Sequence, residues 1–194
     1  MFKCVAIVVL AAAFTSVAAV TDGSVAQKRI AELEVHEATP ASLDELWSDS
    51  LLIVRGRVLD AKATIESSGA ARNVITAARL RVTEVFKKSG QVREKDILPV
   101  YQLAGSVERA DEIVRVKDAE PIRCGGEYIV FLGWNRYLNR WMVRGSTGVF
   151  EVLPDGRIRA FGRSGIALDR NGQRWSTFSD ELRRLAKRQP PAER

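Results

Sequence analysis

Residues 128–132, Tyr-Ile-Val-Phe-Leu, form an unbroken apolar run within the 194-residue chain, and this run decides the fold. Gly125 and Gly126 come just before it and are typical of a tight turn or a bulge. A strand made only of apolar side chains is buried on both faces or crosses the seam of a barrel. We therefore predict a central buried strand over residues 127–134.

On the N-terminal side of this strand the side chains alternate between apolar and polar. Residues 51–63 and 73–86 show the period of two that is typical of strands, and the soft loop 66–69 joins them into a long hairpin. Turn-forming residues at 87–90, 135–139 and 154–156 separate the remaining strands. These shorter strands are expected at 97–103, 112–117, 140–144, 148–153 and 157–161.

Helices are expected only on the flanks of this β region. Ser42 and Glu45 have the spacing of a capping box, which predicts a short helix over 42–47. Ser179 is a suitable N-cap for a C-terminal helix over 179–188, whose end is rich in basic residues. Residues 25–33 could form a marginal helix with Ala26, Ile30 and Leu33 on one face.

The predicted fold class is therefore mainly β, with a short N-terminal helix and a C-terminal helix. A small closed or nearly closed barrel leaves fewer exposed strand edges than an open sheet does. We assign the barrel to residues 42–163 and the basic C-terminal helix and tail to residues 164–194.

The N-terminus has the pattern of a secretory signal peptide. Lys3 precedes an apolar run over residues 4–14, and Val17 and Ala19 place small side chains at the −3 and −1 positions of a cleavage site. A membrane anchor is the alternative, but this run is shorter than the roughly 20 residues that span a bilayer. We predict a signal peptide over 1–19, an acidic polar leader over 20–41, and a periplasmic or extracellular location after cleavage near Ala19.

Three segments in this order resemble a group of exported bacterial proteins of unassigned function. They are residues 43–58, 80–87 and 125–132, and the likeness extends over about residues 43–153. That group has an OB-like barrel reminiscent of the netrin and tissue-inhibitor-of-metalloproteinase module, so the resemblance implies an OB-like barrel here. Inhibitors of that module chelate zinc through an N-terminal cysteine. The expected mature N-terminus is Val20, so inhibition is not carried over to this chain.

Composition limits the available chemistry. The chain has one histidine, His36, and two cysteines, of which only Cys124 would remain after signal cleavage. A histidine–cysteine metal site is excluded on ligand count, and neither a phosphate-binding loop nor a dinucleotide fingerprint is present. Ser146 lacks the surroundings of a nucleophile elbow. We predict no cofactor, no metal and no catalytic residue, and we expect Cys124 to be a half-buried apolar side chain.

Carboxylate-pair catalysis is the remaining enzymatic alternative. Glu84, Glu127 and Glu151 lie on predicted strands, and two acids about 5–9 Å apart would suffice to hydrolyse a glycan. A carboxylate-dependent hydrolase acting on a glycan or an ester therefore stays open. It requires two of these three side chains to converge in one cleft.

Charge is unevenly distributed along the sequence. The chain has 30 basic and 24 acidic residues and a formal net charge of +6; residues 20–50 carry −5, whereas residues 51–154 and 155–194 carry +5 each. This pattern indicates either contact with an anionic polymer or an acidic leader that folds back on the basic end of the chain. Export argues against nucleic acid as the ligand.

Aromatic and arginine side chains gather around one predicted turn. Indole and phenol rings stack on sugars and on cations, so these residues could form a binding groove; packing at the rim of a hairpin is the alternative. Trp47 and Trp175 are expected instead to fill the core from the flanking helices. The candidate binding residues are Tyr101, Trp134, Arg136, Tyr137, Arg140 and Trp141.

The sequence as a whole favours a non-catalytic binding module of the bacterial cell envelope. Its expected partner is an envelope protein or an anionic envelope polymer. A structural subunit of an envelope complex is a further alternative, and it would carry a large exposed apolar patch. The sequence indicates no particular oligomeric state.

Overall fold

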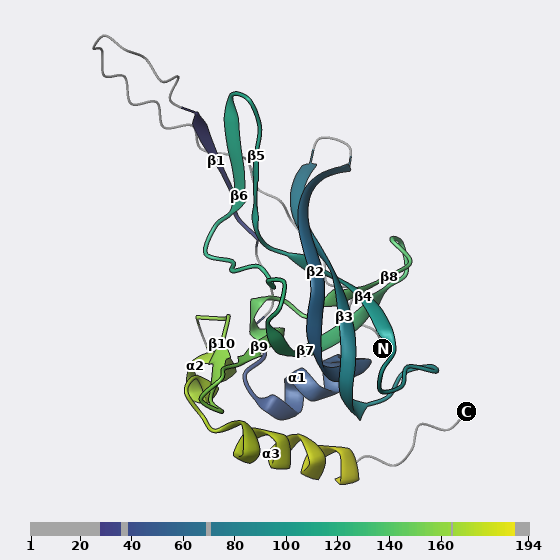
Figure 1. The fold of residues 1–194 in the computed structure, drawn as a ribbon. Coiled ribbons are helices and arrows are strands. Elements are labelled where there is room, and N and C mark those ends of the chain that lie inside the picture. Colours follow the sequence, from purple (N-terminus) through teal and green to yellow (C-terminus); the bar gives the residue numbers. More distant parts are fainter. Residues whose placement is uncertain (1–27, 36–38, 69–70, 164, 189–194) are drawn as a thin grey trace.

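The computed structural model describes residues 28–35, 39–68, 71–163 and 165–188, and within them the fold is mainly β (Figure 1). The predicted signal peptide and residues 20–27 of the leader lie outside the described residues. Among the described helices, none is long and apolar enough to cross a membrane. The strands are β1 (Arg29–Leu33), β2 (Leu52–Ser68), β3 (Ala71–Lys87), β4 (Ile97–Leu103), β5 (Ser106–Glu108), β6 (Glu112–Val116), β7 (Glu127–Asn135), β8 (Arg140–Val143), β9 (Val149–Val152) and β10 (Ile158–Ala160).

Helices lie on the flanks of the described strands, as expected. They are α1 (Leu43–Asp49), α2 (Ile166–Arg170) and α3 (Trp175–Arg188), and a short 3-10 turn covers Ser146–Gly148. The backbone N–H of Glu45 donates to the hydroxyl of Ser42 over 3.1 Å, which confirms Ser42 as the N-cap of α1. The Glu45 carboxylate completes the cap by accepting from the N–H of Ala41 at 2.7 Å.

The larger sheet has the strand order β10-β9-β7-β2-β3-β4-β8, and β8 also pairs with β7. Strands β7, β2, β3, β4 and β8 therefore form a ring of pairings. The ring is uneven: β2 and β3 pair along their whole length, whereas β4 and β8 share only Val100↔Trp141 and Tyr101↔Met142. The predicted long hairpin is confirmed as β2–β3.

Strand β7 separates two apolar clusters. Tyr128, Val130 and Leu132 point into the first cluster, which lies within the ring of strands and which we call the inner core. Ile129 and Phe131 point the other way, and all five side chains are 0% exposed. This confirms the prediction of a strand that is buried on both faces.

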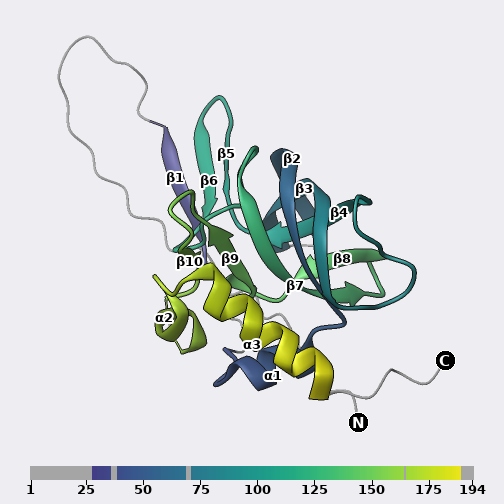
Figure 2. The same cartoon turned by 60° about the horizontal axis from the view of Figure 1, so that its bottom comes forward.

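The second cluster, the outer core, is closed by the helices. Leu46 and Trp47 of α1 and Phe178 and Leu182 of α3 cover the outer face of β7, and Figure 2 shows both helices lying across this face of the sheet. Trp47 is buried and Trp175 packs against the same cluster from α3, so both fill the core as expected.

Helix α3 begins four residues before the predicted start. Ser179 is buried inside the helix, and its hydroxyl donates to the carbonyl of Ser176 over 2.8 Å, so the expectation that Ser179 is the N-cap is wrong. The extra turn exists because Trp175 has two tertiary contacts. Its ring meets that of Phe86 edge-to-face with centroids 6.0 Å apart, and the backbone N–H of Trp175 donates to the carbonyl of Gly156. Tertiary contacts therefore extend the helix beyond its best local cap.

A second, smaller sheet has the order β1-β6-β5, with β1 parallel to β6. The prediction of a marginal helix over 25–33 is therefore wrong for residues 29–33, and residues 25–27 lie outside the described part. The edge of β6 supplies a pairing partner for β1, and Ala31 and Leu33 pack against the third cluster, formed by Val74, Val114 and Val116. This tertiary pairing overrides a weak helical preference.

Candidate functional site

The β7–β8 hairpin positions five of the six predicted binding residues. They are Trp134 on β7, Arg136 and Tyr137 in the turn, and Arg140 and Trp141 on β8. Trp134 and Trp141 are direct cross-strand partners, and their rings meet edge-on with centroids 5.1 Å apart. Trp141 packs against the inner core, whereas Trp134 is 38% exposed. The tryptophan pair therefore forms the boundary between the inner core and solvent, as the rim-packing alternative expected.

Tyr101 on β4 and Arg140 on the neighbouring strand β8 meet on the face opposite to the tryptophan pair. The guanidinium of Arg140 lies 4.5 Å from the centre of the Tyr101 ring. Its two terminal nitrogens donate to the two carboxylate oxygens of Glu66, at 2.9 and 2.6 Å. The six predicted residues are thus divided between two faces and a turn.

The contact between Glu66 and Arg140 is charge-assisted and bidentate. It lowers the pKa of Glu66 and raises the pKa of Arg140, in both cases chiefly through the hydrogen bond between them. Glu66 was not among the predicted site residues, because 74 residues separate it from Arg140 in the chain and the two side chains meet only in the folded protein. Arg140 is therefore engaged inside the molecule.

The turn between β7 and β8 displays the remaining candidates. Tyr137 is 96% exposed, Leu138 is 49% exposed, and Arg136 is also exposed. The side-chain oxygen of Asn135 accepts the N–H of Leu138 at 3.0 Å, and Asn139 adopts a left-handed backbone with φ 50°. The turn therefore has a defined conformation and still presents an aromatic ring to solvent.

Exposed large apolar side chains are concentrated on this hairpin. Of the seven in the described residues, Trp134, Tyr137 and Leu138 share it. Leu138 was not among the predicted residues, because an isolated leucine in a turn-like run carries no signal of its own. We call Trp134, Arg136, Tyr137 and Leu138 the hairpin tip.

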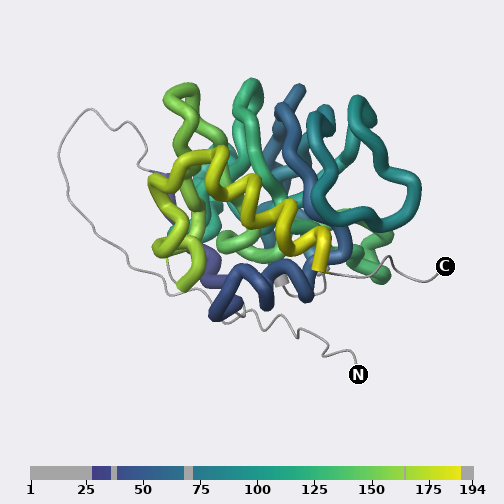
Figure 3. Tube along the Cα trace, turned by 90° about the horizontal axis from the view of Figure 1, so that it is seen from below, coloured from purple at the N-terminus to yellow at the C-terminus, as the bar shows by residue number. Residues whose placement is uncertain are grey.

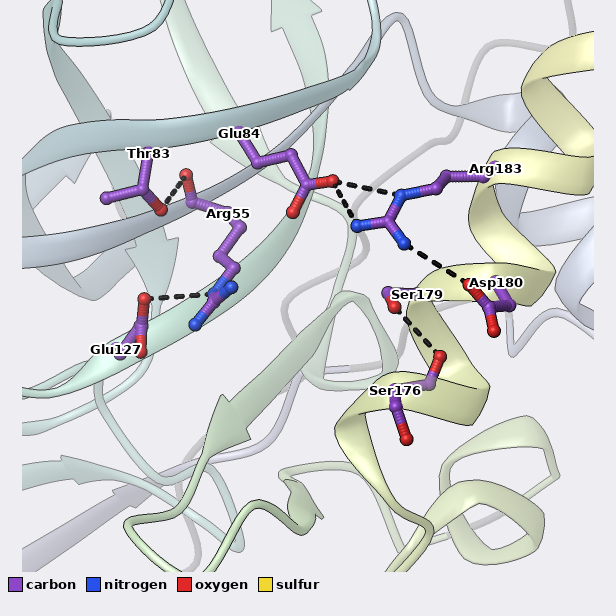
Figure 4. Close-up of polar contacts among 8 residues, drawn as sticks. All are labelled: Arg55, Thr83, Glu84, Glu127, Ser176, Ser179, Asp180 and Arg183. Carbon is purple, nitrogen blue, oxygen red and sulfur yellow. Dashed lines mark hydrogen bonds and ion pairs between the residues drawn. The ribbon is translucent and has the colours of Figure 1, made fainter.

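The three candidate catalytic carboxylates are each paired with an arginine. Glu127 contacts Arg55 at 2.9 Å, and Glu84 contacts Arg183 of α3 at 2.8 Å; Figure 4 shows Arg55 lying between these two acids. Glu151 contacts Arg159 at 2.7 Å, and it lies on β9 next to the edge strand β10. In the described structure each of the three carboxylates is therefore matched by a guanidinium.

The guanidinium of Arg55 also lies 4.5 Å from the centre of the Trp175 ring. Together with the Glu84–Arg183 pair, this contact fastens α3 to the larger sheet (Figure 4). The polar cluster that contains two of the three candidate acids therefore has a clear structural role.

Cys124 and the metal candidates can be placed as well. Cys124 is exposed, so the expectation of a half-buried side chain is wrong; the turn around Gly125 lifts it out of the core, and its thiol donates to the carbonyl of Leu59 at 3.1 Å. Among the described residues no group of three or more histidine, cysteine or acidic side chains could hold a metal ion. His36 lies outside the described residues.

Charges of the leader pair with the second sheet. Glu32 contacts Arg115 and Glu34 contacts Lys117, so these two acids bind β6 and the residue that follows it. The expectation that the acidic leader folds back on the basic C-terminal end is therefore wrong for these residues. Parallel pairing of β1 with β6 places the acids directly beside these two cations.

No protein-family model matches this chain, and no curated protein matches it either.

Proposed function

We propose that the chain is a non-catalytic binding module of the bacterial cell envelope, exported through a signal peptide over residues 1–19, and that the hairpin tip binds an envelope protein. The observation that carries this proposal is the 96% exposure of Tyr137 on a turn of defined conformation. Such a ring contributes almost nothing to the stability of the free chain. Burial at an interface would contribute roughly 1.5–3 kcal/mol for a side chain of this size.

The composition of the hairpin tip fits a protein partner better than a polymer. Tyrosine, tryptophan and arginine are the residues most enriched at the energetic centres of protein interfaces. The tip presents one of each, together with Leu138, which is 49% exposed. A purely electrostatic contact with a polymer would not require the three exposed apolar side chains Trp134, Tyr137 and Leu138.

We further propose that the larger sheet is an OB-like barrel. The ring of pairings β7-β2-β3-β4-β8 supports this, as does the parallel pairing of β4 with β8 in an otherwise antiparallel ring. OB-folds bind ligands through the loops between their first and second and between their fourth and fifth strands. The corresponding segments here are the β2–β3 tip and the β7–β8 turn, which the Glu66–Arg140 pair joins.

Site-specific photocrosslinking tests the proposed function. A photoreactive phenylalanine analogue replaces Tyr137 in the chain expressed in its bacterial host, and we expect one discrete protein adduct in the envelope fraction. The matched control carries the analogue at Leu168, which is 59% exposed on α2, and should give no such adduct. Equal adducts from both positions, or none from Tyr137, would contradict the proposal.

A pair of variants separates binding from folding. The double variant Tyr137→Ser/Leu138→Ser should remove the adduct formed from a probe at Arg136, whereas Leu168→Ser should leave it unchanged. Both changes affect exposed side chains, so the melting temperature should stay within a few degrees of the parent.

Mass spectrometry of the exported chain tests for an N-terminus at Val20.

A further inference from the structure

The loop that joins β3 to β4, residues 88–96, borders two hollows in the surface. The first has a volume of about 430 Å³ and is lined by Val85, Lys88, Arg93, Glu94 and Lys95. The second, of about 490 Å³, is lined by Gln91, Val92, Arg93 and Asp96. Arg93 therefore borders both hollows, which are shallow and open to solvent.

The basic side chains of this loop are exposed and carry no ion pair to any described residue. Lys88, Arg93 and Lys95 face a single carboxylate, Glu94, in the first hollow. Elsewhere the chain pairs many of its cations, as in Arg79–Asp60 and Arg72–Glu112. The first hollow thus keeps an excess of two positive charges that the described part of the protein leaves uncompensated.

The loop is held in place by backbone contacts. The N–H of Lys95 donates to the carbonyl of Val82 at 2.8 Å, and the N–H of Val82 donates to the carbonyl of Asp96 at 2.9 Å. The carboxylate of Asp96 accepts the N–H of Arg93 at 2.8 Å, and Val92 packs against the inner core. The three cations therefore project from a fixed backbone, which reduces the entropy that a ligand must remove on binding.

Lys95 has an unusual backbone conformation for its type. Its φ of 74° lies in the left-handed region, where a side chain other than that of asparagine or aspartate is uncommon. Such a conformation is strained, and it persists only where the surroundings impose it. Here the hydrogen bond from Lys95 to Val82 and the one from Val82 to Asp96 impose it, and they hold the lysine at the rim of the hollow.

We propose that the β3–β4 loop binds consecutive phosphate groups of an anionic polymer. Lysine and arginine are the side chains that bind phosphate oxygens through charge-assisted hydrogen bonds. Val85 is the one apolar residue that lines the first hollow, and three of the other four lining residues are basic. The charges of Arg93 and Asp96 cancel in the second hollow, so the phosphate groups are expected at the three cations of the first hollow.

The basic end of α3 extends this surface. Arg184, Lys187 and Arg188 are exposed, and within the described residues none of them has an ion pair. Figures 1 and 3 show this end of α3 at the same end of the sheet as the β3–β4 loop. A chain-like ligand that leaves the hollows could therefore continue along a second group of cations. The surface is separate from the hairpin tip, so either proposal can fail without the other.

Binding of long-chain sodium polyphosphate to the full folded chain tests the inference. The triple variant Lys88→Gln/Arg93→Gln/Lys95→Gln should weaken binding by roughly tenfold or more, because phosphate contacts dominate such affinities. The matched control, Lys62→Gln/Arg109→Gln/Arg123→Gln, removes the same charge from exposed positions elsewhere that have no described ion pair, and it should change the affinity less than about twofold. Glu94→Gln should strengthen binding.

Three results would overturn the inference. Equal weakening by both triple variants would show a response to net charge alone. If the affinity for inorganic phosphate equalled the affinity for polyphosphate expressed per phosphate group, the site would bind a single ion. Binding to vesicles containing phosphatidylglycerol but not to polyphosphate would assign the surface to a membrane. Thermal unfolding of each variant confirms that the fold is retained.

Discussion

Strands β7 and β1 are held in the molecule by different forces. β7 lies inside the larger sheet, pairs with β2, β8 and β9, and has five consecutive side chains with no exposed area. β1 lies at the edge of the smaller sheet, and among the described strands it pairs only with β6. This strand and the residues directly beside it carry three exposed ion pairs, Lys28–Glu108, Glu32–Arg115 and Glu34–Lys117.

The energies of these two kinds of contact differ in size. A fully buried large apolar side chain contributes about 1.5–3 kcal/mol. An exposed ion pair contributes about 0–1 kcal/mol, and salt screens it. We therefore expect β7 to unfold only with the whole domain, whereas β1 can open locally.

The largest expected effect is at Phe131. Its ring is fully buried in the outer core and meets Phe150 edge-on with centroids 5.9 Å apart. Phe131→Ala should lower the free energy of unfolding by about 3–5 kcal/mol, because it leaves a cavity between β7 and the helices. Urea denaturation measures this change. Phe131→Leu, as the control, should cost much less. A loss below about 1 kcal/mol for the alanine variant would contradict the view that apolar burial of β7 stabilises the domain.

A second test concerns a buried polar group. Gln102 on β4 is 2% exposed; its amide nitrogen donates to the carbonyl of Glu120 at 3.0 Å, and its oxygen accepts the N–H of Ile122 at 2.9 Å. Gln102→Leu should cost about 2 kcal/mol, because both backbone groups lose their partner inside the protein. Gln91→Leu, at an exposed position, should change stability by less than about 0.5 kcal/mol. Similar values for the two variants in urea denaturation would argue against a role for burial.

A strand could be predicted from the sequence where its burial follows from local residues, as in β7, and not where it depends on a distant partner, as in β1. The apolar run of 128–132 is a local property, so its burial follows from the residues themselves. β1 is a strand only because β6 lies beside it, and residues 29 and 112 are far apart in the chain. Local patterns also gave the capping box of α1, but not the start of α3, which depends on Trp175 packing against Phe86.

The candidate site divides in the same way. The pairing of Trp134 with Trp141 follows from a hairpin that the sequence predicts. The contact of Arg140 with Glu66 joins two hairpins and could not be predicted from either one. The hollows on the β3–β4 loop were missed because the sequence gives charges but not concavity.

The Glu66–Arg140 pair is intermediate between the buried contacts of β7 and the exposed ion pairs of β1, because it is only partly buried. Arg140 lowers the pKa of Glu66 below its usual 4.5, so the pair contributes stability above that pH. The contribution is lost as the pH falls through the lowered pKa in the folded state. Glu66→Gln should cost about 0.5–1 kcal/mol at pH 7, after allowance for solvent screening, and this cost should shrink as the pH falls below 4.5. A cost that does not change with pH in urea denaturation would contradict the assignment.

The smallest expected effect is at the ion pairs of β1. Glu32→Gln and Glu34→Gln should each cost less than about 0.5 kcal/mol, and 1 M NaCl should abolish the difference from the parent chain. Leu33→Ala, on the same strand, removes an apolar contact with the third cluster. This variant should lower stability by more than the glutamate variants do, and its effect should be insensitive to salt. Hydrogen exchange of the β1 amides, with and without salt, measures both. If the glutamate variants opened β1 more than Leu33→Ala does, ion pairs and not apolar packing would hold β1 in the smaller sheet. β1 and β7 would then be stabilised by different interactions, and not by different amounts of the same apolar burial.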